Sequence, residues 1–146
     1  MLAGDPKLRD FPWKANADKN TWSGDELSQL ALSQKAIGFN CLNYNGPAEP
    51  TLFRHFMPDK QFMDGNCPDG VRIEIMFPSC WNGKDVTAND HKAHMAYPDH
   101  VIDGNCPEGF ESRVPSLLYE IIYNTNAFKD ERGRFVLANG DPTGKL

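Results

Sequence analysis

The densest group of residues able to do chemistry lies between Trp81 and Asp99. His91 and His94 are three positions apart, and Asp90 directly precedes the first of them. An imidazole can transfer protons near neutral pH or bind a divalent metal, and a nearby carboxylate can orient its ring. The segment lacks the glutamate of a zinc-protease helix. Three interpretations therefore stay open: a polar loop, an acid–base or substrate-binding segment, and a metal site.

Glu74 and Glu120 each lie inside an apolar segment with the character of a β-strand. Glycoside hydrolysis commonly uses two carboxylates that flank the bond being broken, and strands of one sheet could present them. The sequence does not establish that the two side chains share a face. Ion pairing with arginine is the simpler alternative. If the chain is an enzyme, the predicted catalytic residues are His91, His94, Asp90 and Glu120.

Aromatic side chains can stack on the apolar faces of sugar rings. Trp81 and Tyr97 flank the histidine segment and are the favoured candidates, although a core position is the alternative for each. Arg72 and Arg113 could position a substrate or hold the carboxylates. Asp141 lies in a predicted tight turn near the C-terminus and could also point into a site.

Four cysteines indicate the compartment. Cys41, Cys67, Cys80 and Cys106 are separated by 26, 13 and 26 positions, which matches no Cys-x-x-Cys metal motif. Three pairings are possible. The sequential pairing, Cys41–Cys67 and Cys80–Cys106, closes two equal loops worth roughly 3.5 kcal/mol each. Two disulfides are favoured over free thiols and metal ligation, and they predict an oxidising compartment outside the cell.

The elements that must position these residues are mostly strands. Alternating apolar residues predict a strand over 71–77, and the more apolar segment 117–123 predicts a central strand covered on both faces. Shorter strands are predicted over 37–42 and 134–138. A helix is predicted over Ser23–Lys35, capped by Ser23. One domain spanning residues 1–146 is expected, mainly β, as a β-sandwich or jelly roll with a short N-terminal helix, many loops and two disulfides.

A short sequence occurs twice. Asp64–Gly70 reads DGNCPDG and Asp103–Gly109 reads DGNCPEG, 39 positions later. The pattern predicts two turns that each hold a cysteine and lead into a strand. Duplication and convergent turn chemistry explain it equally well.

Charge limits the partners. The net charge is −5 and the cations are scattered, which argues against nucleic acid and anionic membranes. No apolar stretch approaches the length of a membrane span. A neutral partner such as a polysaccharide is expected. No cofactor is expected, and a divalent metal at His91 and His94 is the alternative.

Several segments together resemble a largely fungal, secreted family catalogued as domain of unknown function 1996. They occur in the family's order across nearly the whole chain: Leu2–Arg9, Phe39–Leu42, Cys67–Arg72, Phe77–Lys84, Asp90–Pro98, Arg113–Glu120 and Asn139–Gly144. The resemblance implies an extracellular protein that acts at the cell wall or on plant polysaccharide. It implies no particular reaction.

The resemblance also exposes two departures. A signal peptide and a short segment usually precede the motif at Gly4, and a further segment with a histidine, an aspartate and a tryptophan usually follows Gly144. The sequence is therefore interpreted as truncated at both ends. The leading hypothesis is a glycoside-hydrolase-like enzyme. The alternatives are a non-catalytic carbohydrate-binding or wall-associated module, and a metal-dependent oxidative protein that uses His91 and His94.

Overall fold

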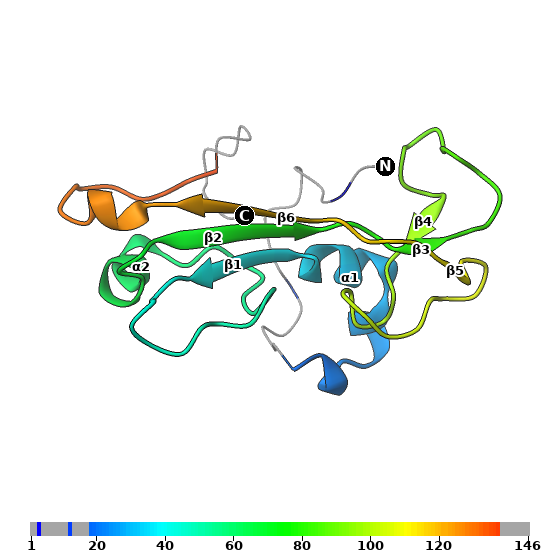
Figure 1. The fold of residues 1–146 in the computed structure, drawn as a ribbon, viewed down its shortest axis with the longest axis horizontal. Helices are drawn as coiled ribbons and strands as arrows, with labels where there is room; N and C mark the ends of the chain where they lie inside the picture. The colour runs from blue at the N-terminus through cyan, green and yellow to red at the C-terminus, as the bar shows by residue number, and fades with distance from the viewer. Residues whose placement is uncertain (1–2, 4–11, 13–17, 138–146) are drawn as a thin grey trace.

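The computed structural model describes Ala3, Pro12 and residues 18–137 (Figure 1). Within these residues the chain forms two three-stranded antiparallel sheets, two α-helices and three 3-10 helices. The helices are η1 (Lys19–Thr21), η2 (Gly24–Leu27), α1 (Gln29–Lys35), α2 (Lys60–Asn66) and η3 (Thr125–Phe128), and the strands are β1 (Ile37–Cys41), β2 (Val71–Met76), β3 (Cys80–Trp81), β4 (Met95–Ala96), β5 (Ser112–Arg113) and β6 (Leu118–Tyr123).

The prediction of a mainly β fold is confirmed, but a sandwich or jelly roll is not. The main sheet has the order β1-β2-β6, and the small sheet has the order β4-β3-β5. Figure 1 shows the small sheet beyond one end of the main sheet instead of stacked on its face. Each strand of the small sheet has only two residues, so the small sheet mainly connects the loops that flank its strands.

The register of the main sheet separates its residues into two faces. Glu74 in β2 lies opposite Gly38 in β1 and opposite Glu120 in β6. Because side chains alternate along a strand, Arg72 and Met76 share this face. We call it the charged face. The other, called the apolar face, carries Val71, Ile73 and Ile75 of β2 together with Tyr119, Ile121 and Tyr123 of β6.

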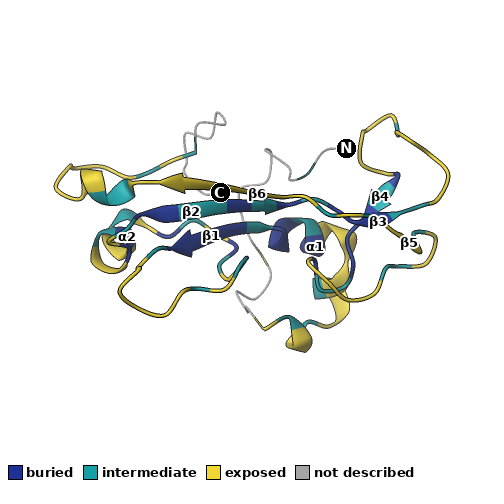
Figure 2. Ribbon diagram, viewed as in Figure 1, coloured by how far each residue is buried: buried dark blue, intermediate teal, exposed yellow. Residues whose placement is uncertain are grey.

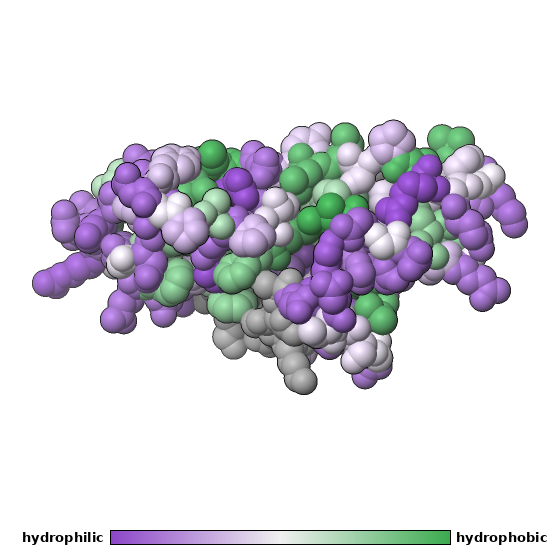
Figure 3. Space-filling view, turned by 60° about the horizontal axis from the view of Figure 1, so that its bottom comes forward, coloured by the Kyte–Doolittle hydropathy of each residue, from purple (hydrophilic) through white to green (hydrophobic). Residues whose placement is uncertain are grey.

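Each face of the main sheet carries its own small core. The cluster on the charged face contains Leu32, Ala36, Leu52, Met76, Tyr97 and Val101, with Trp22 packed against it. The cluster on the apolar face contains Cys41, Met63, Cys67 and Val71, with Ile73 and Phe135 packed against it. Burial is therefore concentrated in β1, β2 and α1, as Figure 2 shows. In Figure 3 the surface has separate apolar patches among hydrophilic side chains.

The prediction of a central strand over residues 117–123 is wrong in position. The strand forms as β6, but β6 pairs only with β2 and all six of its residues are exposed (Figure 2). Its apolar composition suits a strand that is covered, and composition does not tell which neighbours are present. Ile121 and Ile122 remain 53 % and 58 % exposed as a result.

The outer edge of β1 is covered, in contrast to β6. The N–H of Phe39 donates to the carbonyl of Arg54 at 2.8 Å, and the N–H of Cys41 donates to Glu49 Oε2 at 2.7 Å. Arg54 Nη2 in turn pairs with Glu49 Oε1 at 2.8 Å. Backbone and side-chain groups of the following loop thus satisfy N–H groups that an edge strand would otherwise expose.

The predicted helix over Ser23–Lys35 is interrupted. Residue Ser28 has ψ of 147°, which ends η2, and its hydroxyl then accepts from the N–H of Ala31 to cap α1. The start is as predicted, because the N–H of Ser23 donates to Glu26 at 3.4 Å. The structure also has a second helix, α2, which the sequence analysis missed. The predicted strand over 134–138 is not formed in residues 134–137, and Ala138 lies outside the described residues.

The prediction of two disulfides is confirmed, and of the three possible pairings the structure has the sequential one, Cys41–Cys67 and Cys80–Cys106. The two similar seven-residue segments, Asp64–Gly70 and Asp103–Gly109, both end on a glycine with positive φ, +97° at Gly70 and +84° at Gly109. Each glycine turns the chain into a strand, immediately into β2 and after two residues into β5. The first segment begins inside α2, whereas the second begins in a loop.

Candidate functional site

Three charged side chains meet on the charged face. Arg72 Nη2 is 2.8 Å from Glu74 Oε1, and Arg72 Nε is 3.2 Å from Glu120 Oε1. Glu74 and Glu120 are direct cross-strand neighbours, so their carboxyls point the same way. We call this arrangement the Glu–Arg–Glu site. The sequence could not establish the shared face of the two glutamates, and the register does.

The two carboxyls have different surroundings. The side chain of Glu74 is fully buried, whereas that of Glu120 is 41 % exposed. The N–H of Leu52 donates to Glu74 Oε2 at 2.6 Å. Burial raises the pKa of Glu74 above its ordinary value; the Leu52 N–H and the Arg72 charge oppose this rise, and the neighbouring Glu120 carboxyl adds to it. The site therefore places a buried carboxyl with a raised pKa beside an exposed second carboxyl.

The ion pair is imperfectly satisfied. Glu74 Oε1 and Arg72 Nε lie at ion-pair distances from their partners, but neither makes a hydrogen bond of good geometry. Buried polar groups in this state are rare and need an explanation. A buried acid with a perturbed pKa and a specific charged partner is typical of functional sites, although structural ion pairs can produce the same pattern.

A glycine makes room for the buried carboxyl. A Cβ at Gly38 would lie 2.6 Å from Glu74 Oε2 and 2.9 Å from Leu52 Cδ2, both closer than real contacts allow. The backbone of β1 thus approaches Glu74 because position 38 has no side chain. The sequence analysis missed this role of Gly38.

The geometry limits how the two carboxyls can work. In most glycoside hydrolases they are about 5 Å or more apart, so that the reacting sugar fits between them. Glu74 and Glu120 are instead joined by Arg72, which lies at ion-pair distance from both, and Glu74 has no exposed surface. A substrate can reach Glu120 alone. Glu74 can act only through Glu120, as a positioning residue.

We expect Glu74→Gln to change how stability depends on pH. The pKa of Glu74 is raised in the folded protein. The contribution of this carboxyl to the free energy of unfolding is therefore fully present below its ordinary pKa of 4.5, and it is lost as pH rises through the folded pKa. A glutamine cannot ionise, so the variant should lack this loss. Thermal unfolding from pH 4 upward measures the difference between the two proteins. A constant difference across that range would contradict the raised pKa.

The histidine segment does not form one compact site. His91 is exposed, with Nδ1 3.3 Å from Thr87 Oγ1, while His94 is buried and its Nδ1 has no hydrogen-bond partner. Asp90 Oδ1 accepts from the N–H groups of Lys92 and Ala93 at 2.9 and 2.8 Å. These backbone hydrogen bonds lower the pKa of Asp90 and make it a turn-forming residue. No hydrogen bond or ion pair in the described residues joins Asp90, His91 or His94 to Glu120.

The remaining predicted site residues are dispersed. Tyr97 is 5 % exposed and its hydroxyl donates to the carbonyl of Met76 at 2.9 Å, so it is a core residue without a free face for a sugar. Trp81 is partly exposed, and its Nε1 donates to the carbonyl of Asp85. Asp141 lies outside the described residues. Among those described, no group of three or more His, Cys, Asp or Glu side chains could hold a metal ion.

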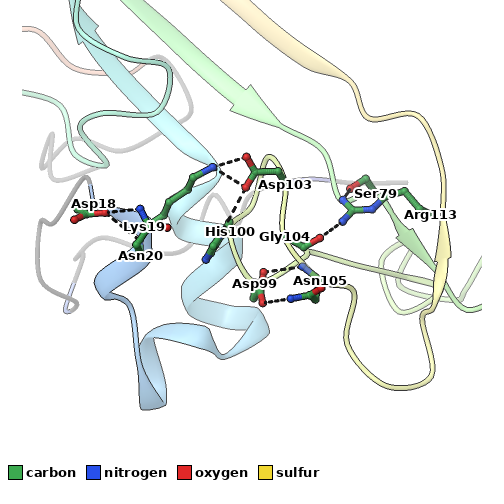
Figure 4. A network of polar contacts seen from close by, with 10 residues as sticks. All are labelled: Asp18, Lys19, Asn20, Ser79, Asp99, His100, Asp103, Gly104, Asn105 and Arg113. Carbon is green, nitrogen blue, oxygen red and sulfur yellow. Dashed lines mark hydrogen bonds and ion pairs between the residues drawn. The ribbon is translucent and has the colours of Figure 1, made fainter.

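Arg113 belongs to a structural network, shown in Figure 4. Its guanidinium donates to Ser79 Oγ at 3.0 Å and to the carbonyl of Gly104. Next to Gly104, Asp103 pairs with Lys19 at 2.5 Å, and the Lys19 contact lowers the pKa of Asp103. Arg113 therefore fastens the loop around Cys106 to the small sheet, and it is not part of the Glu–Arg–Glu site.

The family of the chain follows from comparison with known proteins. Residues 1–145 match the sequence profile of the family described as domain of unknown function, DUF1996. The chain belongs to this family. No curated protein and no solved structure matches it. The predicted resemblance is thus confirmed, and the family itself brings no assigned reaction to the DUF1996 chain.

The family motifs contribute unequally to the site of this DUF1996 chain. Arg72 and Glu120 come from two of them, whereas Glu74 lies between motifs.

Of the described helices, none has both the length and the apolar character needed to cross a bilayer. The sequence analysis also passed over Tyr119, which is 56 % exposed on the apolar face. The alternation of tyrosine and isoleucine around Glu120 could have identified it.

Proposed function

We propose that this DUF1996 chain is a secreted, carbohydrate-active protein that hydrolyses a neutral polysaccharide of the cell wall or of plants. The observation that carries the proposal is the Glu–Arg–Glu site: a buried acid with a raised pKa and an exposed carboxyl lie on the same sheet face, and Arg72 links them. Two disulfides and the net charge of −5 agree with an extracellular protein whose partner is neither nucleic acid nor membrane.

In the proposed reaction, Glu120 is the residue that contacts the substrate. Its carboxyl donates a proton to the glycosidic oxygen as the carbon–oxygen bond breaks, and a water molecule adds to the sugar carbon and returns a proton to Glu120. Glu74 holds the orientation of Glu120 and shares a proton with it. Arg72 keeps the pair together and limits the repulsion that two adjacent carboxylates would otherwise have.

The histidine hypotheses become weaker alternatives. An acid–base role for His91, His94 and Asp90 stays a proposal for a site separate from Glu120. Metal-dependent oxidative chemistry would need ligands besides His91 and His94, and the described residues supply no third one.

A second candidate function is carbohydrate binding without catalysis. Tyr119 and Tyr123 lie on the same face of β6 and are 56 % and 49 % exposed. Four positions along a strand separate them by about 13 Å, so both rings could contact one extended chain of sugars. These tyrosines replace Tyr97 as stacking candidates and lie on the face opposite to Glu120.

Polysaccharide pull-down with reducing-end release measured in the same tubes tests the proposal. The substrates are uncharged cell-wall and plant polysaccharides, each tested alone. Binding with release is the expected result. Binding without release that is lost in Tyr119→Ala would favour the binding module, and the absence of both would contradict both functions.

A further inference from the structure

Within residues 18–137, β6 has a neighbouring strand on one side only, namely β2. The N–H of Phe77 donates to the carbonyl of Leu117 at 2.9 Å, so the backbone groups of Leu117 point toward β2. Because these groups alternate along an antiparallel strand, those of Leu118, Glu120 and Ile122 point away from β2. No backbone hydrogen bond in the described part of the chain reaches them from another segment. We call these three positions the free edge.

The free edge lacks the features that protect edge strands in other proteins. Such strands are blunted by lysine, proline, a bulge or a covering loop. The loop after β1 covers that strand, but β6 contains no proline or lysine, and its register with β2 runs without a bulge from Leu118 to Tyr123. The one charged residue of β6, Glu120, is paired with Arg72 at 3.2 Å. A regular, exposed and apolar edge of this kind is a template for a further strand.

The apolar face of β6 reads the same in both directions. Tyr119 and Tyr123 lie two positions on either side of Ile121, and the three residues are 56 %, 49 % and 53 % exposed, respectively. A two-fold axis at Ile121 would place a second β6 antiparallel to the first. Tyr119 of each copy would then lie opposite Tyr123 of the other, with the two Ile121 residues opposite each other. Aromatic and β-branched pairs stabilise a sheet, and a two-fold interface requires this self-complementarity.

We propose that two copies of this chain form a dimer by pairing their β6 strands edge to edge. In this register Glu120 of one copy lies opposite Ile122 of the other, and each such pair exchanges two N–H···O bonds. A register centred on Glu120 would instead place two carboxylates directly opposite each other, which destabilises a sheet. Because the Arg72 charge balances each Glu120, two acidic chains can approach along this edge.

The size of the interface sets the strength of the dimer. Two paired strands of six residues bury on the order of 1,000 Å², which is near the lower limit of specific interfaces. The dimer is therefore weak and its population depends on concentration. Edge pairing leaves both faces of the sheet open, so the proposal does not rest on polysaccharide hydrolysis.

Sedimentation velocity of the full chain tests the dimer. The dimer fraction should rise between about 1 μM and about 500 μM, the range expected for a weak interface. Ile122→Pro removes an N–H of the free edge and leaves the hydrogen bonds to β2 in place, so it should weaken association at least about tenfold. Ile122→Val keeps the N–H and the β-branched shape, and this matched control should associate like the wild type.

Single added cysteines test the register. All four native cysteines are in disulfides, so an added cysteine is the only free thiol. Two cysteines at position 121 would meet at the two-fold axis within reach of a disulfide, whereas two at position 120 would have Cα atoms more than about 7 Å apart. Ile121→Cys should therefore form a cross-linked dimer at least about tenfold faster than Glu120→Cys.

Circular dichroism establishes that each variant is folded. A chain that stays monomeric at every concentration would overturn the dimer and leave the free edge to a strand of another protein. Association that is equal in Ile122→Pro and Ile122→Val would overturn β6 as the interface. Cross-linking of Glu120→Cys at the rate of Ile121→Cys would overturn the register centred on Ile121.

Discussion

Glu120→Gln is expected to lower polysaccharide turnover by about 10²- to 10⁴-fold, the usual contribution of a positioned acid or base. Glutamine has nearly the same shape but cannot donate or accept the proton. Because Arg72 Nε can still contact a side-chain oxygen at this position, the sheet should keep its register. Polysaccharide binding should therefore change little. Initial rates of reducing-end release, with bound polysaccharide measured in parallel, give both quantities.

Glu108→Gln is the matched control for this prediction. Glu108 is exposed in the turn after Cys106 and belongs to no strand of the main sheet. The control should keep wild-type turnover. Equal rates for Glu120→Gln and Glu108→Gln would contradict the role of Glu120 and would leave the binding function as the better proposal.

Removal of the disulfide between Cys41 and Cys67 is expected to cost about 3.5 kcal/mol of unfolding free energy, because the bond closes a loop of 26 residues in the unfolded chain. Both cysteines are buried in the core of the apolar face, where they contact Met63 and Val71. Urea unfolding of Cys41→Ala/Cys67→Ala, compared with the wild type, measures the effect.

The second disulfide provides the comparison for the first. Cys80–Cys106 closes a loop of the same length, so Cys80→Ala/Cys106→Ala should lose a similar chain-entropy contribution. The hydrogen bonds from Arg113 still fasten that loop in the variant. A loss below about 1 kcal/mol in the Cys41→Ala/Cys67→Ala protein would contradict the expected stabilisation.

Local patterns predicted β1, β2 and the presence of two disulfides, but not the three short strands of the small sheet. Alternation over 71–77 identified β2, and the four cysteines predicted two disulfides, although their pairing stayed open until the fold was known. The position of β6 could not be predicted in this way. Its apolar residues are typical of a covered strand, but whether a strand has one neighbour or two depends on the rest of the fold.

The candidate site shows the same division between local and long-range information. The sequence identified Glu120 and Arg72, and the contact between them requires only the register of two strands. It could not identify the burial of Glu74, which depends on Leu52 and Gly38 from other segments. The composition of the histidine segment predicted a functional site there. In the fold, the side chain of Asp90 accepts a backbone hydrogen bond from Lys92, and His94 and Tyr97 are buried.

The pH dependence of kcat/KM for the wild type and Glu74→Gln tests the central claim most directly, namely that the two carboxyls work as one acid–base pair. Such a pair titrates with apparent pKa values that belong to both groups. In the wild type, turnover should fall as pH rises through the raised pKa of Glu74. In Glu74→Gln this limb should shift, because a glutamine at position 74 cannot ionise. Identical pH profiles for the two proteins would contradict the coupling and the proposed mechanism.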